Sequence, residues 1–260
     1  MFEEMKVVKE MMIGGMSRMP YTKRSDGRKM DELRPIKAKV GIIPNAAGSA
    51  MFGAGKTIAI AAVYGPKPLH PAHMQEPDRG IIRCEYNMLP FSVGERARPG
   101  PSRRSKEIGM VAGNALSSVV DLKRFPGTVI EVQIMIVQAD AGTRCAGINA
   151  AAMALAHAGI VMKEMLSSVA IGKIDDKIVT DITKEEEDYE DGEGPTDIPF
   201  TMTSRKNDIT HLQLDGKIQT ARFKEAIEAA KVACGKIHEI QMKALKGEEV
   251  DENKSKGGKE

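Results

Sequence analysis

The chain has 260 residues and a formal net charge of +2, with 42% hydrophobic and 28% charged residues. This composition is typical of a globular protein with its own core, and the longest apolar runs are too short to cross a bilayer. The first residues lack a basic stretch followed by an apolar one, so we expect no secretory signal, no membrane contact and a cytoplasmic protein. Because the net charge is small, any surface for nucleic acid must be a local one.

The N-terminal quarter predicts an arm followed by strands. Residues 1–24 are methionine-rich and are expected to form an N-terminal arm, whereas residues 34–65 alternate in polarity between glycines, which predicts a strand meander. Gly55, Lys56 and Thr57 resemble the end of a phosphate-binding P-loop. That motif needs a glycine where this chain has Ala50, and a helix must follow it, so we reject a P-loop.

Histidines and cysteines give little sign of a metal site. His70 and His73 lie in a proline-rich loop, and no carboxylate or cysteine is spaced to complete a site with them. Three widely spaced cysteines fit neither a disulfide framework nor a zinc site. We therefore expect the histidines in a surface loop and reduced thiols at Cys84, Cys145 and Cys234.

A basic run at residues 95–106 contains four arginines: Arg96, Arg98, Arg103 and Arg104. Ser102 is expected to cap a helix whose first turn carries Arg103 and Arg104. Cations at a helix N-terminus oppose the helix dipole, so two of them there indicate an external anion such as an RNA phosphate. The alternative is a solvated basic loop, because no aromatic side chain interleaves these arginines to stack on bases.

The segment from Val129 to Ile160 indicates a buried strand, a tight turn and a helix in direct succession. At the start of that helix, unpaired backbone N–H groups and the helix dipole favour an anion, Gly142 allows close approach, and Arg144 can form two hydrogen bonds to it. Phosphate is the obvious candidate. On layout alone the simpler interpretation is favoured, in which Thr143 caps a core helix and Arg144 is solvated.

An acidic run at residues 184–197 precedes an alternating strand that begins at Asp197. Its spacing does not fit a calcium-binding EF-hand loop. Asp197, held at a strand edge, and Asp191, six residues earlier, can together hold Mg²⁺ or act as general acid and base. A helix is expected over 221–245, and residues 246–260 are expected to be a disordered charged tail.

Several motifs occur in the same order as the motifs of one known family. In chain order they are RSDGRKMDELRPI with GSAMFGAGKT and VYGPK, then PSRRSKEI, QADAGTRCAGINAA and DGEGPTDIPF. Together they resemble the RNase PH family, most closely the catalytic RNase PH-like subunits of archaeal exosomes. The resemblance implies one RNase PH-like domain over 25–245, with an α/β (α+β) fold of the ribosomal-protein-S5-domain-2-like type, in which mixed sheets pack with helices. It also implies a hexameric ring with a homologous non-catalytic subunit, and RNA-binding cap proteins.

The resemblance further implies an activity and the residues for it. The activity is phosphorolytic 3′-to-5′ exoribonucleolysis, in which inorganic phosphate attacks the terminal phosphodiester of single-stranded RNA and a nucleoside diphosphate leaves. Gly142, Thr143 and Arg144 match the family's phosphate-binding turn. The basic run matches the family's RNA-binding arginines, with the pair Arg103 and Arg104 nearest the 3′ end and Arg98 and Arg96 beside them.

Asp197 matches the family's catalytic aspartate, expected to protonate the leaving oxygen, to hold Mg²⁺, or both, and Asp191 matches the upstream carboxylate. The acidic run is longer than the family's usual one, so Asp188 competes with Asp191 for that position. Between His70 and His73 the family often has a basic residue, where this chain has Ala72. The resemblance therefore does not support an RNA contact through that loop like the one in family members with the basic residue.

Other functions within the resemblance stay open. The chain can instead be a free-standing RNase PH that trims tRNA 3′ ends, or a non-catalytic ring subunit that only binds RNA, although the presence of Asp197 with Thr143 and Arg144 speaks against the second. A metal-dependent hydrolase that uses the acidic run lies outside the family and would release nucleoside monophosphates without phosphate.

Overall fold

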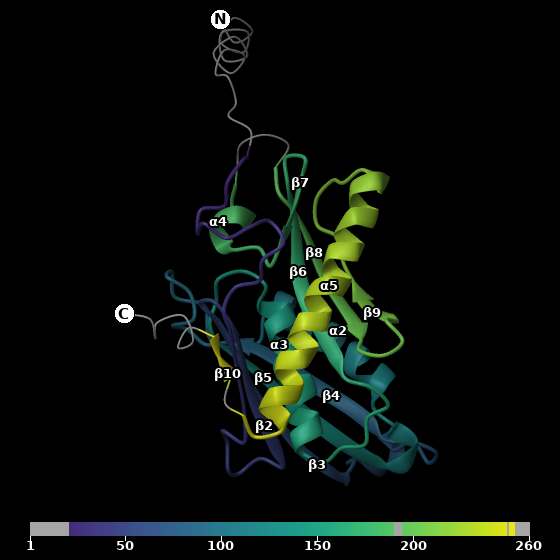
Figure 1. Ribbon diagram of the computed structural model, residues 1–260. Coiled ribbons are helices and arrows are strands. Elements are labelled where there is room, and N and C mark those ends of the chain that lie inside the picture. The colour runs from purple at the N-terminus through teal and green to yellow at the C-terminus, as the bar shows by residue number, and fades with distance from the viewer. Residues whose placement is uncertain (1–20, 190–193, 249, 253–260) are drawn as a thin grey trace, which may run out of the picture.

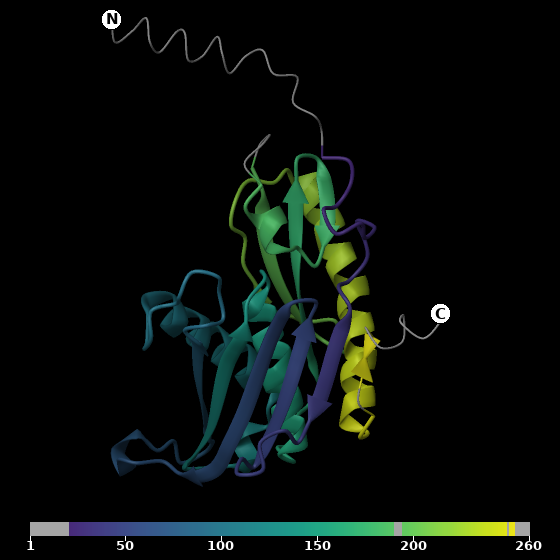
Figure 2. The ribbon, with the colours of Figure 1, turned by 90° about the vertical axis from the view of Figure 1, so that its left-hand side faces the viewer.

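The computed structural model describes residues 21–189, 194–248 and 250–252. Its first sheet has six strands in the order β10 (Val250–Asp251), β1 (Ile36–Val40), β2 (Gly48–Ala54), β3 (Thr57–Pro68), β5 (Thr128–Gln138) and β4 (Ile81–Met88). The second sheet has four, in the order β7 (Lys177–Thr180), β6 (Leu166–Ile174), β8 (Thr196–Thr203) and β9 (Ile209–Leu212). The expected α/β fold with mixed sheets and helices is confirmed, with the two sheets one above the other in Figure 2.

The helices are α2 (Arg103–Val119), α3 (Thr143–His157), the short α4 (Lys184–Glu187) and α5 (Thr220–Leu245), with short 3-10 turns at Ala72–Met74 and Leu122–Arg124. The meander expected in the N-terminal quarter is confirmed, because β1, β2 and β3 pair antiparallel in sequence. β4 pairs parallel to β5, which makes the first sheet mixed. Figure 1 shows α5 in front of both sheets, and Figure 2 shows it running along one side of them.

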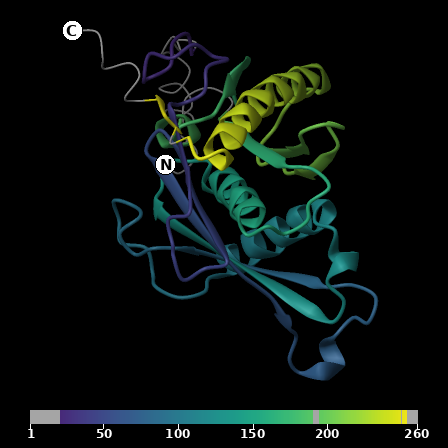
Figure 3. The ribbon, with the colours of Figure 1, turned by 60° about the horizontal axis from the view of Figure 1, so that its bottom comes forward.

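Helix α3 is the centre of the core. Eleven of its fifteen residues are buried, and its sequence is apolar on every side, as expected of a helix without a solvent face. It packs on β2 and β3 of the first sheet and on β6 of the second, and Figure 3 shows it between the first sheet and α5. One continuous cluster of buried side chains joins the two sheets through this helix.

Small residues let the first sheet approach α3 closely. A Cβ atom placed on Gly48 of β2 would lie 2.4 Å from the backbone oxygen of Ala154 and 2.4 Å from the backbone nitrogen of Ala158. Real side chains do not approach backbone atoms so closely, so only glycine allows this distance between strand and helix. The alanines of α3 have the same effect on the helix side, which explains their number.

The ends of the folded chain differ from the boundaries expected at residues 25 and 245. Arg24 is 2% exposed and donates hydrogen bonds to Glu186 and to the backbone oxygen of Thr180, so it belongs to the fold and not to an arm. Residues 250–251 form strand β10 on the edge of β1. The expected disordered tail therefore does not begin at 246, because backbone pairing at an open sheet edge holds two of its residues.

The expected cap of α2 and the expected reduced cysteines are both present. Ser102 caps α2 as expected, and its oxygen accepts a hydrogen bond from the backbone N–H of Ser105, whose side chain returns the contact. All three cysteines are free thiols, two of them buried. Within the described residues, no helix is both long and apolar enough to span a membrane.

The close approach at Gly48 leads to a stability prediction. Gly48→Ala should lower the free energy of unfolding by about 1–3 kcal/mol, because the strand must move away from α3. Gly235→Ala in α5 is the matched control, since nothing lies within 4 Å of its added Cβ, and it should stabilise the protein slightly. Urea unfolding of both variants measures the effect. Equal stability of the two variants would contradict the packing described.

Candidate active site

A cavity of about 560 Å³ opens at the N-terminal end of α3. It is lined by residues of the turn between β5 and α3, by the start of α2, by α4 and by the beginning of β8. The lining includes Gly142, Thr143, Arg144, Arg104, Asp188 and Asp197. The turn, the basic run and the acidic run, which are far apart in the sequence, therefore meet at one place.

The turn presents the start of a helix that none of the described side chains caps. Gly142 is the N-cap residue, in the left-handed conformation with φ 63°, and none of the described side chains bonds to the N–H groups after it. The simpler interpretation, in which Thr143 caps the helix, is thus wrong, because Thr143 is the first helical residue. Uncapped N–H groups and the positive end of the dipole make this end of α3 a place for an anion.

Arg144 adds a positive charge to the same end. Its side chain is only 13% exposed, and its Nη2 lies 3.3 Å from Oε1 of Glu107 on α2. Nη1 is buried and has no hydrogen-bond partner in the described part of the protein. Because a buried N–H group without a partner is costly, the free Nη1 indicates a ligand that accepts from it. Arg144 is therefore not solvated, contrary to the simpler interpretation.

Asp197 lies at the second position of β8, where the β6 and β8 strands and a bridge to Asp215 fix its backbone. Its Oδ1 is buried and finds no partner among the described residues. Burial, followed by the charge of Glu187, raises the pKa of Asp197 to about 6, although Arg144 opposes this rise. A carboxyl group with this pKa can both hold and release a proton near neutral pH.

The four arginines of the basic run do not all line the cavity. Arg104 lines it, whereas the exposed Arg103, Arg98 and Arg96 are not among the described residues that do so. Arg103 and Arg104 form the first turn of α2, as the capping by Ser102 predicts. All four arginines are exposed, and the segment therefore gives one cation in the cavity lining and three outside it.

Besides Asp197, the described part of the acidic run contributes two carboxylates to the cavity lining. Glu187 and Asp188 line the cavity together with Lys184, whose Nζ lies 2.7 Å from Asp188 and 3.4 Å from Glu187. Asp191 lies outside the described residues, so its competition with Asp188 for the upstream position stays open. Lys184 is a cavity residue that sequence reasoning missed, because nothing in an acidic run marks its one lysine.

Tyr86 is a second residue that sequence reasoning missed. It lies in β4, is 3% exposed, and its hydroxyl donates to Oγ1 of Thr143 over 2.9 Å. Burial raises the pKa of the Tyr86 hydroxyl, so it stays a neutral donor. The contact joins the first helical residue of α3 to the first sheet. Its only sequence signal is the inward position of Tyr86 in an alternating strand.

The donor set fits Mg²⁺ only in part. In the residues that the structure describes, no group of three or more His, Cys, Asp or Glu side chains could hold a metal. Mg²⁺ needs few protein ligands, however, and one or two carboxylates with waters and substrate phosphates are enough. The unpaired oxygen of Asp197 fits such a role.

Comparison with known proteins establishes the family. The model of domain 1 of the 3′ exoribonuclease family, RNase PH, matches residues 32–161, and the model of its domain 2 matches residues 164–233. The chain therefore belongs to the RNase PH family of 3′ exoribonucleases. It is 52% identical over 224 residues to the exosome complex component Rrp41 of Thermococcus kodakarensis, covering 86% of this chain and 88% of that one. The Rrp41 of Archaeoglobus fulgidus is 45% identical over 238 residues, covering 88% and 91%.

Solved structures confirm the fold. The crystal structure of rice Rrp46 superposes with a TM-score of 0.74 at 25% identity, covering 85% of this chain and all of that one. A structure described as the Archaeoglobus fulgidus exosome with RNA bound to the active site has a TM-score of 0.71 at 23% identity, covering 84% of this chain and 92% of that one. At this identity the second likeness bears on the fold alone.

The raised pKa of Asp197 predicts a pH-dependent gain in stability for Asp197→Asn. The folded protein binds this proton more tightly than the unfolded chain, so the contribution of Asp197 is full below pH 4 and is lost as the pH rises through about 6. The neutral asparagine avoids this loss. At pH 7.5 the variant should be more stable by on the order of 2 kcal/mol, and the difference should vanish below pH 4.

Urea unfolding at pH 4, 5.5 and 7.5 measures this difference. Asp78→Asn, at an exposed aspartate outside the cavity lining, is the control and should show no pH-dependent gain. A constant difference between wild type and Asp197→Asn over this range would mean that Asp197 is not held in its protonated form by burial.

Proposed function

We propose that the chain is the catalytic subunit of an exosome-type ring and degrades RNA from the 3′ end by phosphorolysis. The observation that carries this proposal is the pairing, in one cavity, of an uncapped helix start and an unpartnered Arg144 N–H with a buried aspartate of raised pKa. The first two suit an anion that enters as co-substrate, and the third suits proton transfer. Family membership and the exosome names of the relatives support the same function.

In the proposed reaction, inorganic phosphate binds at Gly142, Thr143 and Arg144. A phosphate oxygen attacks the terminal phosphorus of the RNA, the bond from that phosphorus to the 3′ oxygen breaks, and a nucleoside diphosphate leaves. The shortened RNA takes a proton on its 3′ oxygen. Asp197, with a pKa of about 6, is the group in the cavity suited to supply that proton.

The basic segment is proposed to bind the RNA backbone. Arg104 in the cavity is proposed to contact the phosphate next to the 3′ end, and Arg103, Arg98 and Arg96 the nucleotides before it. Contacts to phosphates carry no base information, so the enzyme should accept many RNA sequences. Free single-stranded 3′ ends are the expected substrate, because a duplex does not fit a cavity of about 560 Å³.

Mg²⁺ is proposed as a cofactor, held by Asp197 and by Asp191, which lies outside the described residues. The ion would supply positive charge to the phosphate oxygens when bound. The unpaired Oδ1 of Asp197 supports this assignment. Asp188, which lines the cavity, is the alternative partner for Asp197.

The proposed partners are a homologous non-catalytic subunit, with which this chain alternates in a hexameric ring, and RNA-binding cap proteins, all in the cytoplasm. The names of the relatives as exosome components support the assembly. A free-standing RNase PH that trims tRNA ends is the second candidate, since its cavity would use the same residues. A non-catalytic subunit is disfavoured, because such a chain has no use for the buried carboxyl of Asp197.

The identity of the product tests the function. The chain, alone and co-expressed with an RNase PH-like partner, is incubated with a 3′-tailed RNA and Mg²⁺, with and without phosphate, and the released nucleotides are separated by chromatography. We expect nucleoside diphosphates that appear only with phosphate, and none from Asp197→Ala, which should still bind RNA. Monophosphates released without phosphate would show a hydrolase and overturn the proposal.

The basic pair predicts a change in salt dependence. Arg103→Ala combined with Arg104→Ala should weaken RNA binding and lower the slope of log affinity against log salt by about 1.4, because two phosphate contacts are lost at about 0.7 each on single strands. Lys177→Ala, at an exposed residue of β7 outside the cavity lining, is the control. An unchanged slope in the double variant would mean that the pair does not contact RNA phosphates.

A further inference from the structure

The anion-binding turn is held from behind by two buried side chains that are not among the described residues lining the cavity. These are Thr57, at the start of β3, and Arg34, just before β1. Resting on the proposed function, we propose that Thr57 and Arg34 are positioning residues for phosphate: they hold the peptide units of the turn so that the start of α3 is ready to bind the ion.

Thr57 holds two peptide units of the turn with one hydroxyl group. Its Oγ1 accepts a hydrogen bond from the backbone N–H of Asp140 over 3.0 Å and donates one to the backbone oxygen of Ala141 over 2.8 Å. The side chain is fully buried at 0% exposure, so water does not compete for these bonds. The segment rejected as a P-loop thus acts on an anion-binding turn elsewhere in the chain and is not itself the turn.

Arg34 holds the same turn through its guanidinium group. Nη1 donates to the backbone oxygen of Asp140 and lies 3.4 Å from Oγ1 of Thr57. A Cβ atom added to Gly142 would lie 3.2 Å from Nη2, so the guanidinium packs directly under the N-cap residue of α3. The Asp140 carboxylate also accepts from the backbone N–H of Lys184, which joins the turn to α4.

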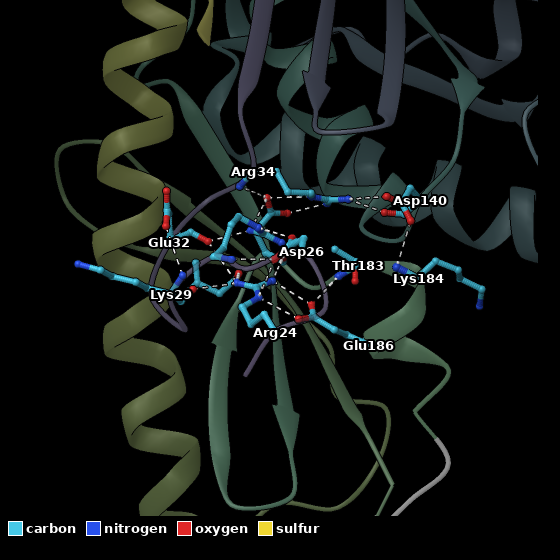
Figure 4. A network of polar contacts seen from close by, with 12 residues as sticks. Arg24, Asp26, Lys29, Glu32, Arg34, Asp140, Thr183, Lys184 and Glu186 are labelled. Carbon is cyan, nitrogen blue, oxygen red and sulfur yellow. Dashed lines mark hydrogen bonds and ion pairs between the residues drawn. The ribbon is translucent and has the colours of Figure 1, made fainter. Parts of the chain in front are cut away.

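Arg34 is itself locked in place by Asp181. Its backbone N–H, Nε and Nη2 all donate to that carboxylate, over 2.8, 3.0 and 2.6 Å. Burial alone would raise the pKa of Asp181, but the Arg34 guanidinium holds it below its usual range, so the pair stays ionised. Figure 4 shows Arg34 and Asp140 on one side of a network that continues to Arg24 and Glu186.

The conformation of the turn explains why it needs this support. Ala141 and Gly142 are both left-handed, with φ 54° and 63°, and for alanine this conformation costs about 1–2 kcal/mol. Without neighbouring bonds the chain would relax to other conformations, and the N–H groups at the start of α3 would no longer converge. Because phosphate affinity depends on that convergence, it should depend on the hydroxyl of Thr57 and the guanidinium of Arg34.

The test compares Thr57→Val, which keeps the shape but removes the hydroxyl, with Thr57→Ser, which keeps the hydroxyl. Thr203→Val is the matched control, because Thr203 is also buried and its Oγ1 accepts from the N–H of Asp208 at the β8–β9 turn, outside the cavity lining. Each variant is studied in the preparation in which wild type degrades RNA. The measurements are KM for phosphate, kcat, RNA affinity, and the rise in Tm on adding phosphate.

We expect Thr57→Val to raise KM for phosphate by about tenfold or more and to lose most of the phosphate-induced rise in Tm, with RNA affinity within about twofold of wild type. Thr57→Ser should recover most of both effects, and Thr203→Val should show neither. Arg34→Lys, which cannot make the forked contact with Asp181, should resemble Thr57→Val or exceed it.

Other results would overturn the inference. If Thr57→Val only loses stability, as Thr203→Val does, and keeps the KM and the phosphate-induced rise in Tm, the two residues serve the fold alone. Should Thr57→Val fail to fold, an unchanged KM for phosphate in Arg34→Lys would equally rule out a positioning role. A wild type that shows neither phosphate-dependent products nor the rise in Tm would instead remove the proposed function, and this inference with it.

Discussion

The burial of α3 is the constraint on which the rest of the structure depends. A helix packed on both sheets has no solvent face, so its amphipathic pattern disappears and its position is fixed by small residues such as Gly48. Its N-terminal end opens into the cavity of about 560 Å³. With Gly142 as N-cap and no described side chain bonded to the first N–H groups, this end is available to an anion. The position of the candidate active site is thus a consequence of how the core is built.

Burial and neighbouring charges together set the pKa values of the aspartates in and near the cavity. Asp197 stands among the cations Arg104 and Arg144, which favour its charged form, and yet its pKa is raised to about 6, because burial and Glu187 outweigh them. Asp181, also buried, has a lowered pKa, because Arg34 forms three hydrogen bonds to it, two of them from the guanidinium. The partners of the two carboxylates cause the difference between their pKa values, because Asp181 is even more buried than Asp197. Asp197 is therefore suited to proton transfer and Asp181 to structure.

Much of the candidate site could be predicted from short, local patterns. The strand, turn and helix around Gly142, the cap at Ser102 and the strand that begins near Asp197 each depend on neighbours in sequence, and each has the expected form. Lys184 and Tyr86 could not be found this way. Lys184 joins the cavity lining through the packing of α4, and Tyr86 contacts Thr143 of that lining from β4. No local pattern distinguishes them from surface and core residues of the same types.

The sequence by itself determined the class of fold, the order of its strands and helices, and the family to which the chain belongs, because these follow from periodicity, turn residues and motifs. Only the tertiary structure decided that the N-cap of α3 is Gly142, that one N–H of Arg144 has no partner among the described residues, and that Thr57 and Arg34 hold the turn. The contacts behind these features join residues far apart in the sequence, 23 residues for Thr57 with Arg34 and 106 for Arg34 with Asp140. Such contacts arise from packing of the whole chain and leave no mark on any local stretch of it.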